Sequence, residues 1–195
     1  AGIINTSRKE TVDGLEEVFS VNHLAYYSFT LMLMNKLIER GPSRVVNVAS
    51  GAHMFVKDMN FDDLQSEKEY KTMQVYGRSK LANILFTREL AERLEGKGVT
   101  VNCLHPGFVN TGIGSNNSPT MGRILMALAR PFSRKTDRGA ETSIYLCVSP
   151  EVENQTGEYF YDCKKEKISA AASDKENATK LWEVSSKLTG IDLLD

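Results

Sequence analysis

The residue pair with the clearest chemical meaning is Tyr76 and Lys80, in the stretch Tyr76-Gly77-Arg78-Ser79-Lys80. A spacing of four residues puts both side chains on one face of a helix, one turn apart. A free tyrosine has a pKa of about 10, which makes it a poor proton shuttle at neutral pH. A lysine charge held nearby favours the phenolate, so the pair predicts acid–base chemistry. Taken alone, the same spacing is also typical of a solvated helix face.

Two predicted strands end at residues that could bind a ligand. The β-branched run over 44–49 reads as a buried strand that ends at Ser50 and Gly51, and a second strand over 99–104 breaks at Pro106-Gly107. Ligands of open α/β sheets bind at the carboxyl ends of the strands. Ser50 is therefore placed either to hydrogen-bond a substrate oxygen or merely to cap its strand.

The order of these motifs resembles the short-chain dehydrogenase/reductase family, which has a serine after a strand, then Tyr-x-x-x-Lys, then Pro-Gly-x-x-x-Thr. The stretch 76–94 and the segments HPGFVNT (105–111) and TGEYF (156–160) are similar to the retinol dehydrogenase branch of that family. The resemblance runs over nearly all of the chain. It implies an NAD(P)-dependent oxidoreductase that transfers a hydride between the cofactor and an apolar carbonyl or alcohol, such as retinal or retinol.

The resemblance also assigns roles to single residues. Tyr76 would be the general acid or base, and Lys80 would lower its pKa and bind the nicotinamide ribose. Ser50 would bind the same substrate oxygen as Tyr76 and stabilise the charge that develops there. Asn22 matches the family's helix asparagine, which holds a water that relays protons to the lysine.

The cofactor positions follow in the same way, with NADP the more common cofactor of the branch and NAD the alternative. Ala1 and Gly2 match the end of an Asn-Asn-Ala-Gly motif. The segment that fixes the nicotinamide amide is matched by Pro106, Gly107, Val109 and Thr111. Tyr76 and Lys80 complete the set.

Two positions depart from the family pattern. Ala49 stands where the branch usually has a first serine, and Ala25 stands where Asn-x-x-Gly has glycine. A methyl group at position 25 is expected to crowd the packing of the helix that carries Asn22.

The family's glycine-rich turn, which binds the cofactor pyrophosphate, does not occur in this sequence. We therefore expect the C-terminal two-thirds of a longer protein, with residues 1–195 in a single domain. The expected fold is α/β: a Rossmann-like doubly wound parallel sheet with helices on both faces, lacking its first strands.

The expected elements can be given by range. Ile3-Ile4 ends a strand, and a capping box at Asp13 to Glu16 starts a helix that runs to Arg40. Residues 51–70 are irregular, and the Tyr-Lys helix covers 71–95. The remaining elements are the strands over 44–49, 99–104 and 158–161, and the helices over 123–130, 137–148 and 174–188.

Charge balance, the cysteine and histidine spacing and the apolar runs limit which partners and ligands the sequence predicts. Lys and Arg total 24 and Asp and Glu total 25, so nothing favours nucleic acid. Three cysteines without a Cys-x-x-Cys and three histidines without ligand spacing predict neither disulfide nor metal, and fit a cytoplasmic protein. No run reaches the ~20 apolar residues of a membrane span, although an anchor before Ala1 stays open.

Two other functions stay open. The chain can be a truncated, non-catalytic relic or interaction module, or a serine hydrolase built on Ser50 with His53 or His105. The hydrolase lacks a Gly-x-Ser-x-Gly elbow and a placed acid. Separately, an apolar segment over 121–132 with basic flanks can line a substrate pocket, pack internally or in a homo-oligomer, or rest on a membrane surface.

Overall fold

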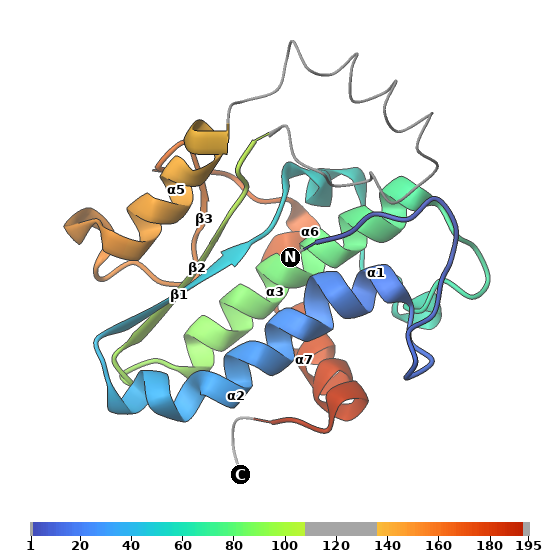
Figure 1. Ribbon diagram of the computed structural model, residues 1–195, viewed down its shortest axis with the longest axis horizontal. Helices are drawn as coiled ribbons and strands as arrows, with labels where there is room; N and C mark the ends of the chain where they lie inside the picture. The colour runs from blue at the N-terminus through green and yellow to red at the C-terminus, as the bar shows by residue number, and fades with distance from the viewer. Residues whose placement is uncertain (1, 108–135, 193–195) are drawn as a thin grey trace.

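The computed structural model describes residues 2–107 and 136–192 (Figure 1). Four strands form one sheet in the order β1-β2-β3-β4. β1 (Ser43–Val48), β2 (Val99–Leu104) and β3 (Tyr159–Tyr161) are parallel, and β4 (Lys164–Lys165) returns antiparallel to β3. The predicted Rossmann-like α/β fold is confirmed, and among the described strands only the two-residue β4 was not anticipated.

Helices cover both faces of this sheet. α2 (Ala25–Glu39) and α3 (Thr72–Arg93) lie on one face, and α5 (Thr136–Val148) lies on the other (Figure 1). α7 (Lys175–Thr189) packs on the outer side of α3. The shorter helices and turns are α1 (Glu17–Phe19), η1 (Ser20–Leu24), η2 (Gly51–Phe55), η3 (Phe61–Asp63), η5 (Pro150–Val152) and α6 (Ala170–Ser173).

α3 is the central element of the core. Its residues Leu81 and Leu85 are fully buried in a cluster that also includes Leu181 of α7. Phe86 lies in a second cluster, where its ring faces Tyr27 of α2 at 5.5 Å between centroids. Because α3 is held by the sheet, α2 and α7 together, its first turns have a fixed position relative to the strand ends.

The start of the first helix was predicted wrongly. The helix begins at Glu17, not after Asp13, and its cap is the Glu16 side chain, which accepts hydrogen bonds from the backbone amides of Val18 (3.0 Å) and Phe19 (2.6 Å). The helix then runs to Glu39, as expected within one residue, through the π-helical turn η1 (Ser20–Leu24) that lies between α1 and α2. A π-turn inserts one extra residue per turn, and such turns occur often at functional sites.

The predicted strand end at Ile3-Ile4 is also wrong for the part of the chain described here. No described strand pairs with this segment. The Asn22 side chain takes the place of a strand partner: its Oδ1 accepts from the Ile3 amide (2.7 Å) and its Nδ2 donates to the Ile3 carbonyl (2.9 Å).

The other predicted elements agree within one or two residues, except the helix over 123–130, which lies outside the described residues. Within the two described stretches, none of the helices has the length and apolar character that crossing a membrane requires.

Candidate active site

Ser50 lies two residues beyond the end of β1, where an extended backbone turns into η2. Its Oγ accepts a hydrogen bond from the Ala52 amide at 3.1 Å. This contact is the capping role anticipated for Ser50. The hydroxyl hydrogen is not used by that bond, so Ser50 can still donate to a second oxygen.

Lys80 points from α3 toward the same end of β1. Its Nζ donates to the Val48 carbonyl at 3.3 Å and lies 5.7 Å from the centroid of the Tyr76 ring. Only 4% of Lys80 is exposed, and burial lowers its pKa to about 8. A solvated helix face is therefore excluded for this lysine.

The electrostatics of Tyr76 differ from the sequence expectation. Burial raises the pKa of Tyr76, and a hydrogen bond with Ser50 lowers it by less. The net direction is upward, opposite to the lowering expected from Lys80, because desolvation of the phenolate outweighs the other contributions. Tyr76 is thus a neutral phenol at pH 7, in hydrogen-bond contact with Ser50.

Asn22 is fully buried within the π-turn η1. Besides holding Ile3, its Nδ2 donates to Ser79 Oγ at 3.0 Å, and that hydroxyl donates to the Tyr76 carbonyl at 2.8 Å. Gly2 completes this corner, because a Cβ on it would lie 3.5 Å from Asn22 Oδ1 and 3.7 Å from Lys80 Nζ. The structure therefore brings Asn22, Lys80 and Gly2 together.

Neither departure from the family pattern disturbs this arrangement. Ala25 is exposed, so its methyl group points to solvent and does not crowd the helix as expected. Ala49 is buried, and its amide donates to the Leu104 carbonyl at 2.7 Å.

Pro106 and Gly107 follow β2 next to the Ser50 turn. β1 and β2 are in parallel register, with Val48 opposite Leu104, so both carboxyl ends reach the same edge. Gly107 has a φ of +79°, and its amide donates to His105 Nδ1 at 3.2 Å. Ala1, Val109 and Thr111 lie outside the described residues.

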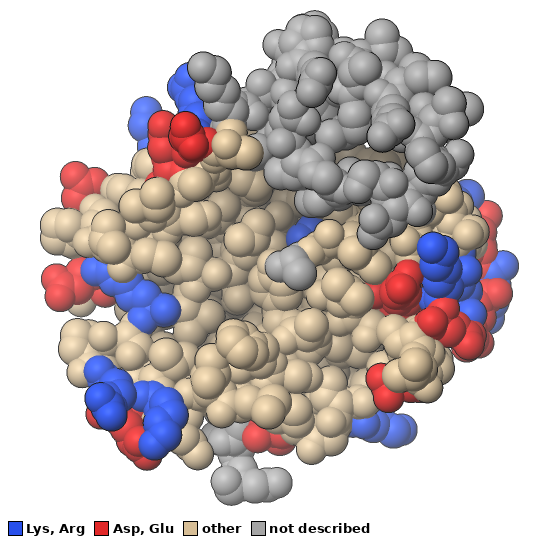
Figure 2. All heavy atoms as spheres, in the orientation of Figure 1, with Lys and Arg blue, Asp and Glu red and all other residues tan. Residues whose placement is uncertain are grey.

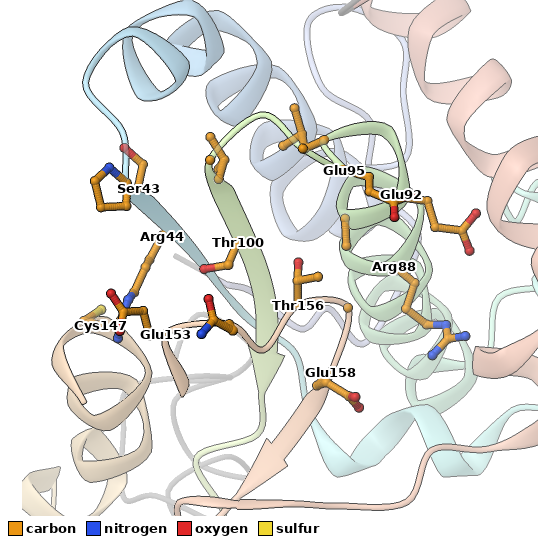
Figure 3. Close-up of a pocket in the computed structure, with 18 residues that line it drawn as sticks. Ser43, Arg44, Arg88, Glu92, Glu95, Thr100, Cys147, Glu153, Thr156 and Glu158 are labelled. Carbon is orange, nitrogen blue, oxygen red and sulfur yellow. The ribbon is translucent and has the colours of Figure 1, made fainter. Parts of the chain in front are cut away.

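A hollow in the described part of the chain lies away from these residues. Figure 3 shows this hollow of about 740 Å³, lined by Arg44, Thr100 and Glu158 among others. Arg44 and Thr100 belong to the amino-terminal halves of β1 and β2, at the opposite end from Ser50. Because ligands of this fold class bind at the carboxyl ends, the hollow is not the candidate active site.

The serine hydrolase alternative needs a histidine that acts as a general base for Ser50. His53 Nδ1 contacts the backbone oxygen of Ser50 at 2.8 Å, not its hydroxyl. His105 Nδ1 accepts the Gly107 amide. His53 is therefore not arranged to take a proton from Ser50 Oγ, and Nδ1 of His105 is occupied by the Gly107 amide.

The roles of two important residues were missed from the sequence. Gly77, beside Tyr76, packs directly on η2, and Glu16 caps the first helix. A glycine inside an otherwise strong helical pattern is a signal of close packing that was available for Gly77. The role of Glu16 had no comparable local signal.

Comparison with known proteins agrees with this geometry. A short chain dehydrogenase family model matches residues 1–122. Human retinol dehydrogenase 14 is 47% identical over 98% of the chain, and human retinol dehydrogenase 12 is 42% identical over 98%. The chain spans 57% and 60% of the length of these two relatives.

Solved structures show the same fold. A crystal structure of an uncharacterized protein from Mycobacterium paratuberculosis superposes with a TM-score of 0.75, at 27% identity, over 99% of this chain and 66% of that one. A 4-hydroxyisoleucine dehydrogenase complexed with NADH and succinate has a TM-score of 0.58 at 20% identity, over 82% of this chain and 62% of its own. With the motifs, the site geometry and these matches in agreement, the chain belongs to the short-chain dehydrogenase/reductase family and is retinol dehydrogenase-like.

Proposed function

We propose that this chain forms the catalytic part of an NAD(P)-dependent oxidoreductase that interconverts an apolar alcohol and its carbonyl. The observation that carries the proposal is the meeting of Ser50, Tyr76 and Lys80 at the carboxyl end of β1. Tyr76 is in hydrogen-bond contact with Ser50, and Lys80 is buried beside it. Three polar groups from two separate elements converge there on one point.

In the reduction direction, Tyr76 gives its proton to the carbonyl oxygen of the substrate, and Ser50 donates a hydrogen bond to the same oxygen. A neutral phenol suits this role, because it has a proton to give at pH 7. In the oxidation direction, the same hydroxyl must lose its proton, and the charge of Lys80 favours that loss. Asn22 holds the Tyr76 turn through Ser79, which keeps the phenol in place.

The residues present fit the nicotinamide end of a dinucleotide. Gly2 leaves space beside Lys80, where any larger residue would place a Cβ 3.7 Å from Nζ. Gly107 adopts a positive φ after β2. We assign Gly2, Lys80, Pro106 and Gly107 to cofactor binding, together with Ala1, Val109 and Thr111. The cofactor, NADP or NAD, supplies the hydride.

The proposed substrate rests on the relatives. Proteins named retinol dehydrogenases match nearly the whole chain, so a retinoid or similar apolar alcohol or aldehyde is the substrate class to test first. Since the chain spans about three-fifths of those relatives, we further propose that it acts as the C-terminal two-thirds of one Rossmann domain in a longer protein. The alternative is a non-catalytic relic that retains the site.

A surface contact is proposed separately. α2 exposes Phe29 (68%), Met32 (73%) and Leu33 (41%). On the face shown in Figure 2, the area over α2 and α3 is almost free of charged side chains, which gather around its rim. This area suits a homo-oligomer contact. The apolar segment over 121–132, which its sequence makes a candidate for peripheral membrane contact, lies outside the described residues.

Absorbance of the reduced nicotinamide tests the function directly. We expect the full-length protein to oxidise NADPH or NADH in the presence of all-trans retinal, and not to hydrolyse acyl esters. Cofactor binding without turnover of any apolar aldehyde or ketone would favour the relic. Ester hydrolysis that depends on Ser50 would overturn the proposal.

A further inference from the structure

His53 lies directly behind the candidate active site, and the proposed chemistry leaves it without a role. Only 1% of the residue is exposed. Its ring is held on three sides: Nδ1 contacts the Ser50 carbonyl at 2.8 Å, the Ser169 amide contacts Nε2 at 3.4 Å, and the Tyr159 ring lies edge-on at 5.1 Å. These partners come from three separate segments of the chain.

The partners determine the protonation of the ring. The Ser50 carbonyl can only accept, so Nδ1 must carry the hydrogen. The Ser169 amide can only donate, so Nε2 must be bare. Burial also lowers the pKa of His53, which agrees with a neutral ring. His53 is therefore a neutral imidazole in a single tautomer, linking the Ser50 turn to the start of α6.

This link acts on the backbone of Ser50. The Ser50 carbonyl accepts from the His53 amide as well (3.3 Å), while Ser50 Oγ accepts from the Ala52 amide. The His105 ring also packs against this turn. It stacks on the Tyr161 ring with 4.0 Å between centroids, and its Cε1 lies 3.8 Å from the position that a Cβ on Gly51 would take. With its carbonyl held and its Oγ accepting from the Ala52 amide, the position of Ser50 Oγ is fixed, and only the hydroxyl hydrogen can still rotate toward an acceptor.

We propose that His53 is a positioning residue for Ser50: its Nδ1–H holds the Ser50 carbonyl so that the serine hydroxyl faces Tyr76 and the substrate oxygen. This inference rests on the proposed function, because the direction of the Ser50 hydroxyl matters only for that chemistry. A positioned donor contributes more in the transition state than in the ground state, because charge develops on the oxygen that it faces. Loss of the positioning should therefore act on kcat more than on KM.

Two substitutions of His53 each keep one of its ring hydrogen bonds and remove the other, either the bond to the Ser50 carbonyl or the bond from the Ser169 amide. In H53N the side-chain amide ends near the position of Nδ1 and can still donate to the Ser50 carbonyl. In H53Q it ends near the position of Nε2, so it keeps an acceptor for Ser169 but loses the Ser50 contact. In the full-length protein we expect H53Q to lower kcat by roughly 10- to 100-fold with little change in KM. We expect H53N to stay within about threefold of the parent kcat.

A double-mutant cycle with Ser50→Ala shows whether the effect passes through Ser50. If it does, adding H53Q to Ser50→Ala costs no further kcat. If the kcat losses from H53Q and Ser50→Ala multiply, the effect does not pass through Ser50 and the inference fails. It also fails if H53N and H53Q lose kcat equally and in proportion to a fall in melting temperature, because His53 then has only a structural role. Tyr76→Phe serves as the control. An active Tyr76→Phe protein means that the proposed function failed. An inactive Tyr76→Phe protein, together with kcat losses of H53Q and Ser50→Ala that multiply, means that only this inference failed.

Discussion

Gly77 and Ala52 are in direct packing contact, although they lie on different elements. A Cβ placed on Gly77 would come within 2.8 Å of the Ala52 carbonyl oxygen and 3.1 Å of Val56 Cγ1. Real Cβ atoms do not approach an oxygen so closely. The absence of a side chain at position 77 therefore allows α3 to lie against η2, which brings Tyr76 beside the Ser50 turn.

Gly77→Ala is expected to lower the free energy of unfolding by ~1–3 kcal/mol, because the added methyl overpacks this contact. Helix propensity alone predicts the opposite sign, a gain of about 1 kcal/mol. Chemical denaturation decides between the two. Met73→Ala, at an exposed position of the same helix, is the control and should change stability by no more than about 0.5 kcal/mol. A stabilised Gly77→Ala protein would contradict the packing argument.

Tyr76→Phe in the full-length protein is expected to abolish turnover while leaving the fold intact. The change removes the proton donor and only one oxygen atom. Loss of a general acid typically costs about 10²–10⁴-fold in rate. Steady-state kinetics with circular dichroism as the folding control check this expectation, and a kcat within about threefold of the parent would remove Tyr76 from its assigned role.

Ser50→Ala is expected to lower kcat more than it raises KM. The hydrogen bond from Ser50 strengthens as negative charge develops on the substrate oxygen, and loss of one such donor typically costs roughly 10²–10³-fold. Separate values of kcat and KM test this point. A change in KM alone would mean that Ser50 binds the ground state and the transition state equally.

His23 makes stability depend on pH. Burial lowers the pKa of His23 to about 4, and its Nε2 is within 2.8 Å of Ser185 Oγ. Below pH 6.5 the unfolded chain binds a proton at His23 that the folded chain does not bind until about pH 4. Stability is thus fully present above pH 6.5 and falls between pH 6.5 and 4, by about 3 kcal/mol in total.

The matched variant is His23→Gln, which cannot titrate in this range but can still reach Ser185. The free energy of unfolding of the parent, minus that of the variant, should decrease as the pH falls from 6.5 to 4. Taking this difference removes the contribution of the carboxylates, which titrate in both proteins. A difference that does not change with pH would show that His23 is not protonated on unfolding.

The chain with the sequence given is expected to bind nicotinamide dinucleotide poorly and to be inactive. The glycine-rich turn that would bind the pyrophosphate does not occur in it. Hydrogen bonds to charged groups contribute about 1.5–3 kcal/mol each, so losing several should weaken binding by roughly 100-fold or more. Calorimetry on this chain, beside a version extended with an N-terminal βαβ unit, measures the difference. Equal affinity would show that the turn is not needed.

The sequence by itself determined the order of the motifs and most of the elements, but not the start of the first helix. The spacing of Tyr76 and Lys80 depends only on the local period of a helix, and the strand over 99–104 is specified by its own β-branched and apolar residues. Both were predicted correctly because their signals are local. The same holds for Ser50 at the end of β1.

Tertiary contacts decided the rest. Asp13 was the predicted cap, but Glu16 caps the helix, and its amide donates to the Gln65 side chain at 2.7 Å, a partner 49 residues away. Asn22 reaches Ser79, 57 residues away, and His53 reaches Ser169, 116 residues away. The pKa of Tyr76 rises because the folded chain buries the phenol, and burial is a property of the packed structure that no local pattern contains.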